Sequence, residues 1–373
     1  MKSHRLAIIA SATVLVPSVA HANGGSVVML AGIAHLLFGN IILGVLEGLL
    51  LTWRSRAPFW RTIPWMIVAN YASMLVGACL LDVRLVSPNE LTLLNVRFWF
   101  GVFVTCAFLV TLLVEFPFFV FALWKAKWSL WRVARLTLFV HVVSYALLFG
   151  WYWSASGTSI LTDLDVVPAE AIGVPAGYDL YYIASDGQSI LRADLAGRML
   201  ENIDGPASTD WDDRLFARRN ERGSFDLMIR RDVSGRGQCI ERTLRRDFSP
   251  DAPIDAGVAE GYSAHPEGTM FNVGAVPRLV RESDWEYYVG IWAVQGIRGE
   301  NGKTGERIGF SLETPFMAWL VRNAVHVDGD FVVFQLGPDQ ICILHPQRKQ
   351  IALVARGRGC LVARRCVPPD QGP

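Results

Sequence analysis

The chain lacks the short motifs that mark the most common catalytic sites. It has no Gly-x-Ser-x-Gly elbow, no His-Glu-x-x-His pair, no P-loop and no Gly-x-Gly-x-x-Gly turn after a strand. These absences argue against the most frequent hydrolase, metalloprotease and nucleotide-binding classes. We therefore predict no cofactor from motifs and expect no catalytic turnover.

Charge is scarce in the first 153 residues. They hold 11 Lys and Arg and 4 Asp and Glu residues, whereas the rest of the chain holds 24 and 30. Hydrophobic residues make up 52% of the 373 residues, which is too apolar for an average soluble protein. The apolar part is basic on balance and the rest of the chain is acidic, which argues against nucleic acid as a partner, because phosphate binding requires a concentrated basic face. The composition predicts a membrane protein whose first partner is the lipid bilayer.

The first 22 residues have the pattern of a secretory signal peptide. Lys2 and Arg5 precede a short apolar core at 6–19, and residues 20–22 (Ala-His-Ala) form a small-x-small cleavage site. An uncleaved anchor helix is the alternative. Both interpretations place residue 23 outside the cytoplasm.

Four apolar stretches follow, each long enough to cross a hydrocarbon layer of about 30 Å as a helix. They cover residues 27–52, 63–81, 98–124 and 133–153. The first and third connections are rich in Lys and Arg, and positively charged connections stay in the cytoplasm. We therefore predict a multi-pass four-helix domain in a bacterial inner membrane. A periplasmic domain at 154–367 and a disordered tail at 368–373 complete the predicted organisation.

Each predicted span carries one costly polar residue at a similar depth. These residues are Glu47, Asn70, Glu115 and His141. Counted from the nearest cytoplasmic basic residue, all four lie roughly 9–15 Å from the inner boundary at 1.5 Å per residue. Small and hydroxyl residues share their helix faces, namely Asn40 and Gly44, Ser73 and Gly77, Thr111, Thr137 and Ser144. The spacing predicts a polar cluster inside the membrane.

Three interpretations of this cluster remain open. In the first, a protonated Glu hydrogen-bonds Asn70 or His141 and locks the bundle. In the second, Glu47, Glu115 and His141 bind a divalent metal, for which two carboxylates and an imidazole are a suitable ligand set. In the third, the group carries protons or ions. His35, in the outer half of the first span, is expected to pack against its neighbours without binding a ligand.

From residue 156 the chain has short alternating stretches separated by turn residues. Strand candidates such as Tyr178–Ile183 and Phe331–Leu336, spaced without helical stretches between them, predict an all-β domain. The segments LYYIASDGQSILRADLAG (180–197) and DGDFVVFQLGPDQICILHPQRKQIALVARG (328–357) resemble blades of extracellular β-propellers. This resemblance implies an irregular or partial propeller with a binding or scaffolding surface. A β-sandwich is the alternative.

Four of the six cysteines belong to this domain, namely Cys239, Cys342, Cys360 and Cys366. The predicted compartment is oxidising, so a disulfide among them is allowed. Free buried thiols are the alternative.

The sequence favours a membrane-anchored envelope protein whose periplasmic domain binds or scaffolds an envelope protein or a glycan. The aromatic run Trp285, Tyr287, Tyr288 and Trp292 is either a sugar-stacking shelf or part of the core. The alternative function is a small transporter or an intramembrane metal- or proton-binding protein. It would work through Glu47, Glu115 and His141.

Overall fold

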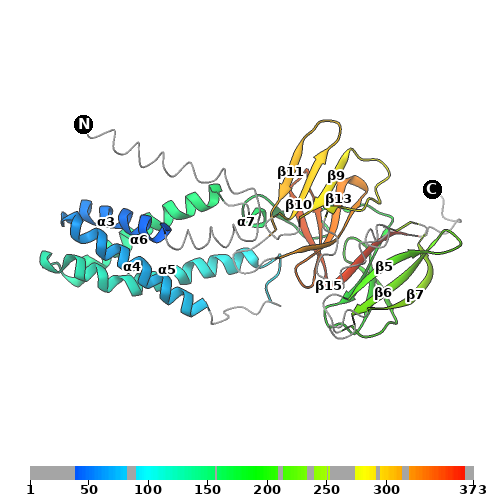
Figure 1. The fold of residues 1–373 in the computed structure, drawn as a ribbon, viewed down its shortest axis with the longest axis horizontal. Coiled ribbons are helices and arrows are strands. Elements are labelled where there is room, and N and C mark those ends of the chain that lie inside the picture. The colour runs from blue at the N-terminus through cyan, green and yellow to red at the C-terminus, as the bar shows by residue number, and fades with distance from the viewer. Residues whose placement is uncertain are drawn as a thin grey trace. The chain divides into compact units, whose positions relative to one another are not determined.

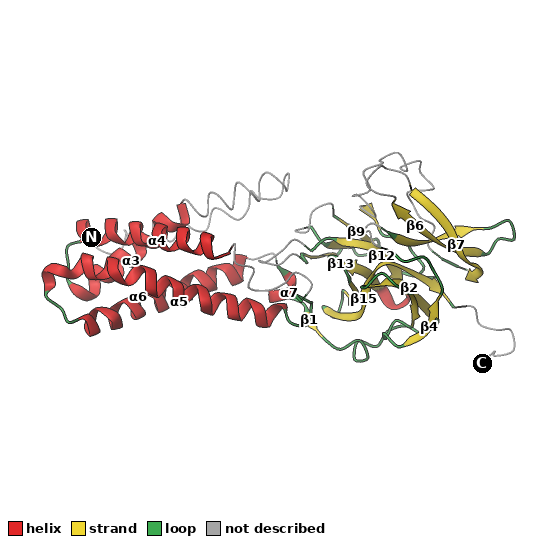
Figure 2. Cartoon of the chain, turned by 90° about the horizontal axis from the view of Figure 1, so that it is seen from below, coloured by secondary structure: helices red, strands yellow, loops and turns green. Residues whose placement is uncertain are grey.

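A computed structural model divides the chain into two units. One comprises Met1–Leu91 and Arg97–Ser156, and the other comprises Thr92–Val96 and Gly157–Pro373. The long helices belong to the first, which we call the helical unit, and the strands to the second, the β unit (Figure 2). The structure describes residues 38–81, 90–155, 158–208, 213–232, 239–249, 251–252, 274–290, 295–312 and 319–365. The predicted signal peptide, the start of the first span, His35 and the predicted tail lie outside these residues.

The described part of the helical unit consists of four long helices (Figure 1). They are α3 (Asn40–Ser55), α4 (Phe59–Leu81), α5 (Val96–Leu123) and α6 (Leu130–Ala155). A left-handed residue ends α3, because Arg56 has a φ of 59° and its N–H donates to the carbonyl of Thr52 at 2.9 Å. The single 3₁₀ turn η3 (Trp124–Ala126) follows α5. The two short connections, both rich in Lys and Arg, therefore lie at the same end of the helices, which we call the basic end.

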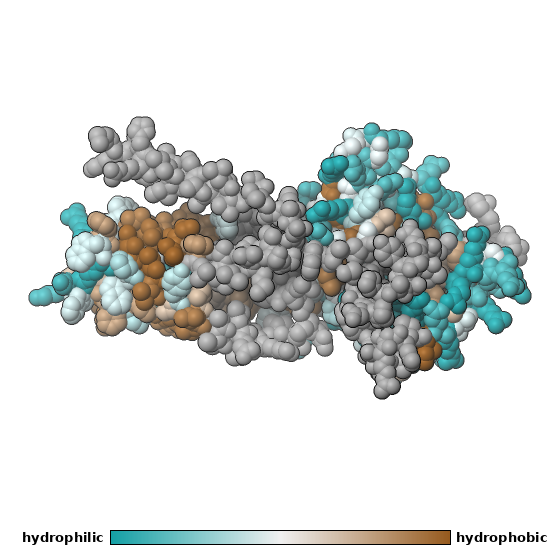
Figure 3. Space-filling model, in the orientation of Figure 1, coloured by the Kyte–Doolittle hydropathy of each residue, from teal (hydrophilic) through white to brown (hydrophobic). Residues whose placement is uncertain are grey.

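Two helical segments, Val96–Ala126 and Leu130–Trp151, are long and apolar enough to cross a membrane. They correspond to the third and fourth predicted spans. The described part of α3 has 16 residues, or about 24 Å of helix, and neither α3 nor α4 qualifies within the described residues. Hydrophobic side chains gather over the helices, whereas hydrophilic ones predominate on the face of the β unit seen in Figure 3.

Glycines allow α3 and α4 to pack closely. A Cβ added at Gly44 would lie 2.6 Å from the Cα atom of Ile67, and one at Gly48 would lie 2.7 Å from that of Ile63. Such close approach is typical of membrane helices, which gain no hydrophobic drive from association in lipid. All four helices contribute to a buried cluster that we call the apolar plug. Its residues are Leu51, Met66, Ala69, Phe119, Ala122, Leu123, Val133, Leu136 and Val140.

The β unit contains three sheets. The largest has eight strands in the order β12-β13-β14-β15-β2-β3-β4, with β1 paired to β15, and it is curled like half a barrel (Figure 1). A four-stranded sheet has the order β11-β10-β9-β8, and a three-stranded sheet has the order β5-β6-β7. A four-residue helix, α7 (Ser159–Thr162), precedes the strands. The strands are β1 (Asp165–Val166), β2 (Tyr178–Ala184), β3 (Ile190–Ala193), β4 (Met199–Ile203), β5 (Arg214–Arg219), β6 (Phe225–Asp232), β7 (Cys239–Ser249), β8 (Gly274–Ala275), β9 (Trp285–Val289), β10 (Ile297–Asn301), β11 (Arg307–Phe310), β12 (Val321–Val327), β13 (Phe331–Leu336), β14 (Gln340–His345) and β15 (Gln350–Arg364).

Two cores cover opposite faces of the large sheet. Leu180 and Tyr182 of β2 belong to one core, together with residues of β12 to β15. Tyr181 and Ile183, which alternate with them, belong to the other core, together with residues of β5 and β6. Strand β2 is thus buried on both faces, since side chains alternate across a strand.

The strand prediction is confirmed for the clearest hairpins, but the propeller gains no support. Strands β2 and β3 pair across a turn in which Gly187 has a φ of 70°. The two segments that resemble blades are not separate sheets, because β15 pairs with β2 over Gly357–Arg364. A propeller blade is a self-contained sheet of about four strands, whereas here both segments contribute to one curled sheet.

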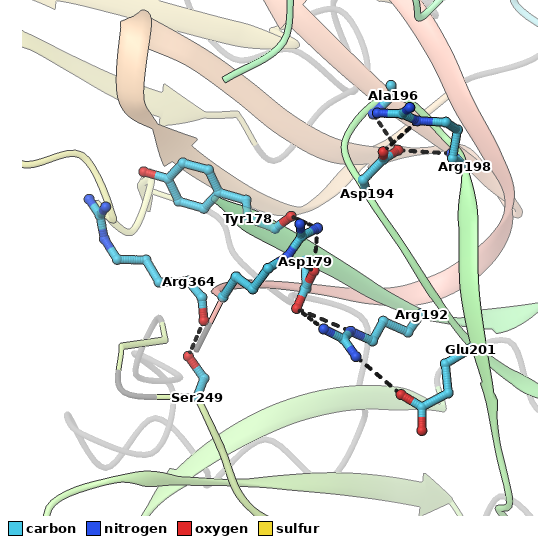
Figure 4. Close-up of polar contacts among 10 residues, drawn as sticks. Tyr178, Asp179, Arg192, Asp194, Ala196, Arg198, Glu201, Ser249 and Arg364 are labelled. Atoms are coloured by element: carbon cyan, nitrogen blue, oxygen red, sulfur yellow. Dashed lines mark hydrogen bonds and ion pairs between the residues drawn. The ribbon is translucent and has the colours of Figure 1, made fainter. Parts of the chain in front are cut away.

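Ion pairs brace the place where the C-terminal strand meets β2 (Figure 4). The carboxylate of Asp179 is buried and accepts hydrogen bonds from Arg192 at 2.6 Å and from Arg365 at 2.9 Å. Arg192 also contacts Glu201 at 3.2 Å. The hydroxyl of Ser249 donates to the carbonyl of Arg364 at 2.7 Å. Arg365 thus ties the end of β15 to β2, Arg192 ties β3 to β2 and β4, and Ser249 ties β7 to β15. The paired residues of β15 and β2 are more than 170 positions apart in the chain.

Candidate metal centre in the helical unit

The predicted polar residues meet inside the helical unit, one from each helix. Glu47 lies on α3, Asn70 on α4, Glu115 on α5 and His141 on α6, and all four are buried. One ligand atom each of Glu47, Glu115 and His141 lies within 4.8 Å of the other two. We call these three residues with Asn70 the polar centre.

Neighbouring polar groups orient the two carboxylates. The amide of Asn70 donates to Oε2 of Glu47 at 2.7 Å, and the hydroxyl of Ser73 donates to Oε1 of Glu115 at 2.6 Å. One oxygen of each carboxylate is thereby held by α4. Outer partners of this kind orient metal-ligating carboxylates in proteins.

The imidazole of His141 is oriented in the same manner. Its Nδ1 lies 2.8 Å from the carbonyl oxygen of Thr137. A carbonyl only accepts hydrogen bonds, so Nδ1 carries the proton and donates. The other nitrogen, Nε2, faces Oε2 of Glu115 at 3.2 Å. A backbone bond that fixes the tautomer through one ring nitrogen and turns the other towards acidic side chains is typical of a metal-binding histidine.

The local sequence explains how these groups are brought together. Gly44 stands one turn before Glu47 and allows α3 to approach α4, so that Glu47 reaches Asn70. Ser73 stands three residues after Asn70 and bonds its carbonyl as well as Glu115. Thr137 stands four residues before His141, and the ring of Phe119 packs against the imidazole at 5.4 Å between ring centroids. Within each helix, the residue that supports the polar centre lies three or four positions from the residue it supports, and residues at this spacing share a helix face.

This arrangement supplies two carboxylate oxygens and one imidazole nitrogen in an enclosed site. Hard and borderline divalent ions such as Zn²⁺, Mn²⁺ and Fe²⁺ accept this mixed oxygen and nitrogen set, whereas Cu⁺ prefers sulfur. Two carboxylates at such depth are costly unless protons or a cation neutralise them. The geometry therefore suits either a bound cation or shared protons.

Not every residue on the predicted faces reaches the polar centre. Asn40 donates to the sulfur of Met74 at 3.1 Å, and Thr111 shares a hydrogen bond with Tyr145 at 3.0 Å. A Cβ at Gly77 would meet nothing within 4 Å. The partnership of Ser73 with Glu115 was not predicted, although Ser73 shares a helix face with Asn70.

The cysteines of the β unit form no pair among the described side chains. Cys342 and Cys360 are buried free thiols. Burial raises the pKa of both thiols, that of Cys360 to about 12. Cys366 and the side chain of Cys239 lie outside the described residues, so a pair that involves them remains a prediction.

Two members of the aromatic run belong to the core of the β unit. Trp285 and Tyr287 are buried and their rings stack with centroids 6.2 Å apart. Tyr288 is exposed, and Trp292 lies outside the described residues. A sugar-stacking shelf built from all four rings is therefore wrong for Trp285 and Tyr287, because their faces are used in packing.

Comparison of the chain with protein-family models, with curated proteins and with solved structures gives no match in any of the three. The function is therefore argued from the residues of the site.

Proposed function

We propose that this is a multi-pass protein of a bacterial inner membrane whose helical unit binds a divalent transition-metal cation. The β unit stands on the extracytoplasmic side in this proposal. One observation carries the metal-binding role: ligand atoms of Glu47, Glu115 and His141 lie within 4.8 Å of one another in a buried site. A cation there would balance the carboxylate charge that otherwise disfavours burial.

The exposed apolar side chains of the helices support the proposal that the helical unit spans a membrane. Large apolar side chains on the helices are exposed, with Leu113 at 76% and Phe98 at 66%. A water-soluble bundle would bury such residues, whereas lipid solvates them. The basic connections at one end supply the charge asymmetry that orients a bundle with this end in the cytoplasm.

The course of the chain supports the sidedness. The segment Thr92–Val96, between α4 and α5, belongs to the β unit, as does the chain after α6. Within that unit, the N–H of Leu93 donates to the side-chain oxygen of Gln340 at 2.6 Å. When four helices cross alternately, the second connection and the C-terminal continuation emerge on the same side, which is opposite to the basic connections.

Metal analysis of the purified full chain tests the metal-binding role. We expect about one Zn²⁺, Mn²⁺ or Fe²⁺ per chain, and loss of that metal in Glu47→Gln, Glu115→Gln and His141→Ala. Thr105→Val is the matched control, since Thr105 lies exposed on α5 and bonds only the carbonyl of Gly101. Absence of metal after exposure to each of these ions, in a chain that remains folded, would overturn the proposal.

The second candidate function is a membrane-anchored scaffold in which the polar centre only locks the helices together. One observation favours it: Asn70, Ser73 and Thr137 already provide hydrogen-bond partners for the polar centre. The β unit would then bind an envelope protein or a glycan. In that case Glu47→Gln and Glu115→Gln leave the metal content at zero, as in the wild type, and alter only the stability of the helices.

A further inference from the structure

The surroundings of the polar centre differ between its two sides. Towards the basic end lies the apolar plug, whose nine residues all come from segments between the polar centre and the basic connections. Met66, Ala69, Phe119, Ala122 and Val140 are each 0% exposed. Polar groups on this side bond one another or the backbone. The hydroxyls of Thr52 and Thr62 lie 2.6 Å apart, Arg61 donates to the carbonyl of Phe121 at 2.8 Å, and Thr137 donates to the carbonyl of Val133 in its own helix at 3.0 Å.

The side that points away from the basic end, which we call the remote side, is polar. Ser73 on α4 and Ser144 on α6 stand one turn from Asn70 and His141 in this direction. The hydroxyls of Thr111 and Tyr145 follow, joined across α5 and α6 at 3.0 Å. Asn40 stands further along on α3 and bonds the sulfur of Met74. Hydroxyl and amide groups thus continue from the polar centre along the remote side.

The side chains on the remote side are also packed less tightly than those of the apolar plug. In the described remote-side segments 40–46, 71–77, 97–114 and 142–151, no large apolar side chain is fully buried. Thr111 and Tyr145 are partly exposed, whereas every member of the plug is buried. A tightly packed apolar cluster resists the passage of a hydrated ion, because interiors hold few voids as large as a water molecule.

From this asymmetry we infer that the cation enters and leaves the polar centre from the remote side, past Tyr145 and Thr111, and that the apolar plug closes the route to the basic end. The inference rests on the metal-binding function proposed above. A divalent ion arrives with bound water, and each water must be replaced by a protein oxygen or nitrogen as it is lost. Hydroxyl groups provide such replacements in sequence, whereas the side chains of Leu136 and Val140 provide none.

The test uses the full chain in sealed membranes, with Zn²⁺ as the bound ion and EDTA as an impermeant chelator. Spheroplasts and inverted membrane vesicles are loaded with Zn²⁺, washed and treated with EDTA, and Zn²⁺ retained by the repurified chain is then measured. Protease cleavage of the β unit in the same preparations reports which side is exposed. We expect EDTA to remove Zn²⁺ only in the preparation in which protease also cleaves the β unit.

Variants sharpen the test. Tyr145→Phe and Thr111→Val should slow removal of Zn²⁺ by about tenfold, the rate equivalent of about one lost hydrogen bond. Thr105→Val, on the exposed face of α5, should leave it unchanged. Val140→Ser places a hydroxyl in the apolar plug. It should allow EDTA to remove Zn²⁺ also in the preparation in which protease does not cleave the β unit.

The outcomes separate this inference from the proposed function. Removal of Zn²⁺ only from the protease-protected side, or equally from both sides in the wild type, overturns the inference and leaves metal binding intact. A chain that never retains Zn²⁺ or another divalent ion overturns both. Equal removal rates in Tyr145→Phe, Thr111→Val and the wild type would also contradict the proposed route.

Discussion

The Nε2 atom of His141 lies 3.2 Å from Oε2 of Glu115, and both side chains are 0% exposed. The two residues belong to consecutive helices and are 26 positions apart. One ligand atom of Glu47, on α3, lies within 4.8 Å of a ligand atom of each of these residues, so one ion could contact all three. Two carboxylates beside one imidazole carry more negative charge than the imidazole can balance, and uncompensated charge is costly in an apolar bundle.

The first prediction concerns the residue that orients Glu115. Ser73→Ala removes the hydroxyl that donates to Oε1 of Glu115 at 2.6 Å. The affinity for Zn²⁺ should fall by about 10- to 100-fold, since loss of an outer partner of a metal ligand has this effect in other proteins. Competition with a chromophoric chelator measures the change. Ser154→Ala is the control, because Ser154 is exposed and bonds only the carbonyl of Trp151; an equal loss in both variants would contradict the orienting role.

The second prediction concerns the approach of α3 to α4. In Gly44→Ala the new Cβ would lie 2.6 Å from the backbone of Ile67, so the helices must separate at a cost of about 1–3 kcal/mol. Gly77→Ala meets nothing within 4 Å and should be neutral, or stabilising by up to about 1 kcal/mol through helix propensity. Thermal unfolding of the full chain in detergent, followed by its helical circular dichroism, compares the two. A lower midpoint in Gly77→Ala than in Gly44→Ala would contradict this packing.

Much of the polar centre could be predicted because helix geometry is regular. One residue per span at a shared depth was enough to single out Glu47, Asn70, Glu115 and His141. The atomic partners could not be predicted in the same manner. The rotation of each helix and the close approach at Gly44 decide that Ser73, and not Asn70, bonds Glu115.

The strands show where sequence patterns fail. Strands β2 and β13 were predicted because turn residues and short apolar stretches agree. Strand β7 was missed, because it carries charged residues on both faces and its register with β6 shifts at Leu227. Strand β12 was missed as well, since the left-handed Asn323 (φ 50°) interrupts its alternation. The pairing of β15 with β2 joins distant parts of the chain, and no local pattern determines such a partner.

The third prediction concerns the pH dependence of the β unit. Burial lowers the pKa of His326, and Arg278 acts in the same direction, whereas Asp330 at 3.3 Å and Asp328 act against it. The unfolded chain, with an ordinary histidine pKa of about 6.5, therefore binds more protons than the folded chain below that pH. The free energy of unfolding should then fall as the pH decreases from about 6.5 towards the lower folded pKa. Pulse proteolysis of the β unit in urea measures this slope.

A variant separates the contribution of His326 from that of other groups. His326→Gln removes the titrating ring and should flatten the slope below pH 6.5, even if it lowers stability at every pH. Part of the slope should remain, because burial also lowers the pKa of His345. An unchanged slope in His326→Gln would show that His326 is not held neutral in the folded β unit.

The fourth prediction compares two glycines with similar backbone angles. Gly359 has a φ of 59° and sits where the register of β15 with β2 shifts, and Gly305 has a φ of 69° in a turn. An alanine in this left-handed region costs about 1–2 kcal/mol at either site. A Cβ at Gly359 would also lie 2.6 Å from the Cα atom of Arg214, whereas one at Gly305 meets nothing within 4 Å. Gly359→Ala should therefore destabilise the β unit by about 1–3 kcal/mol more than Gly305→Ala, the usual range for overpacking. Pulse proteolysis in urea at neutral pH measures both values, and equal losses would mean that β15 does not pack against β5 as closely as the structure has it.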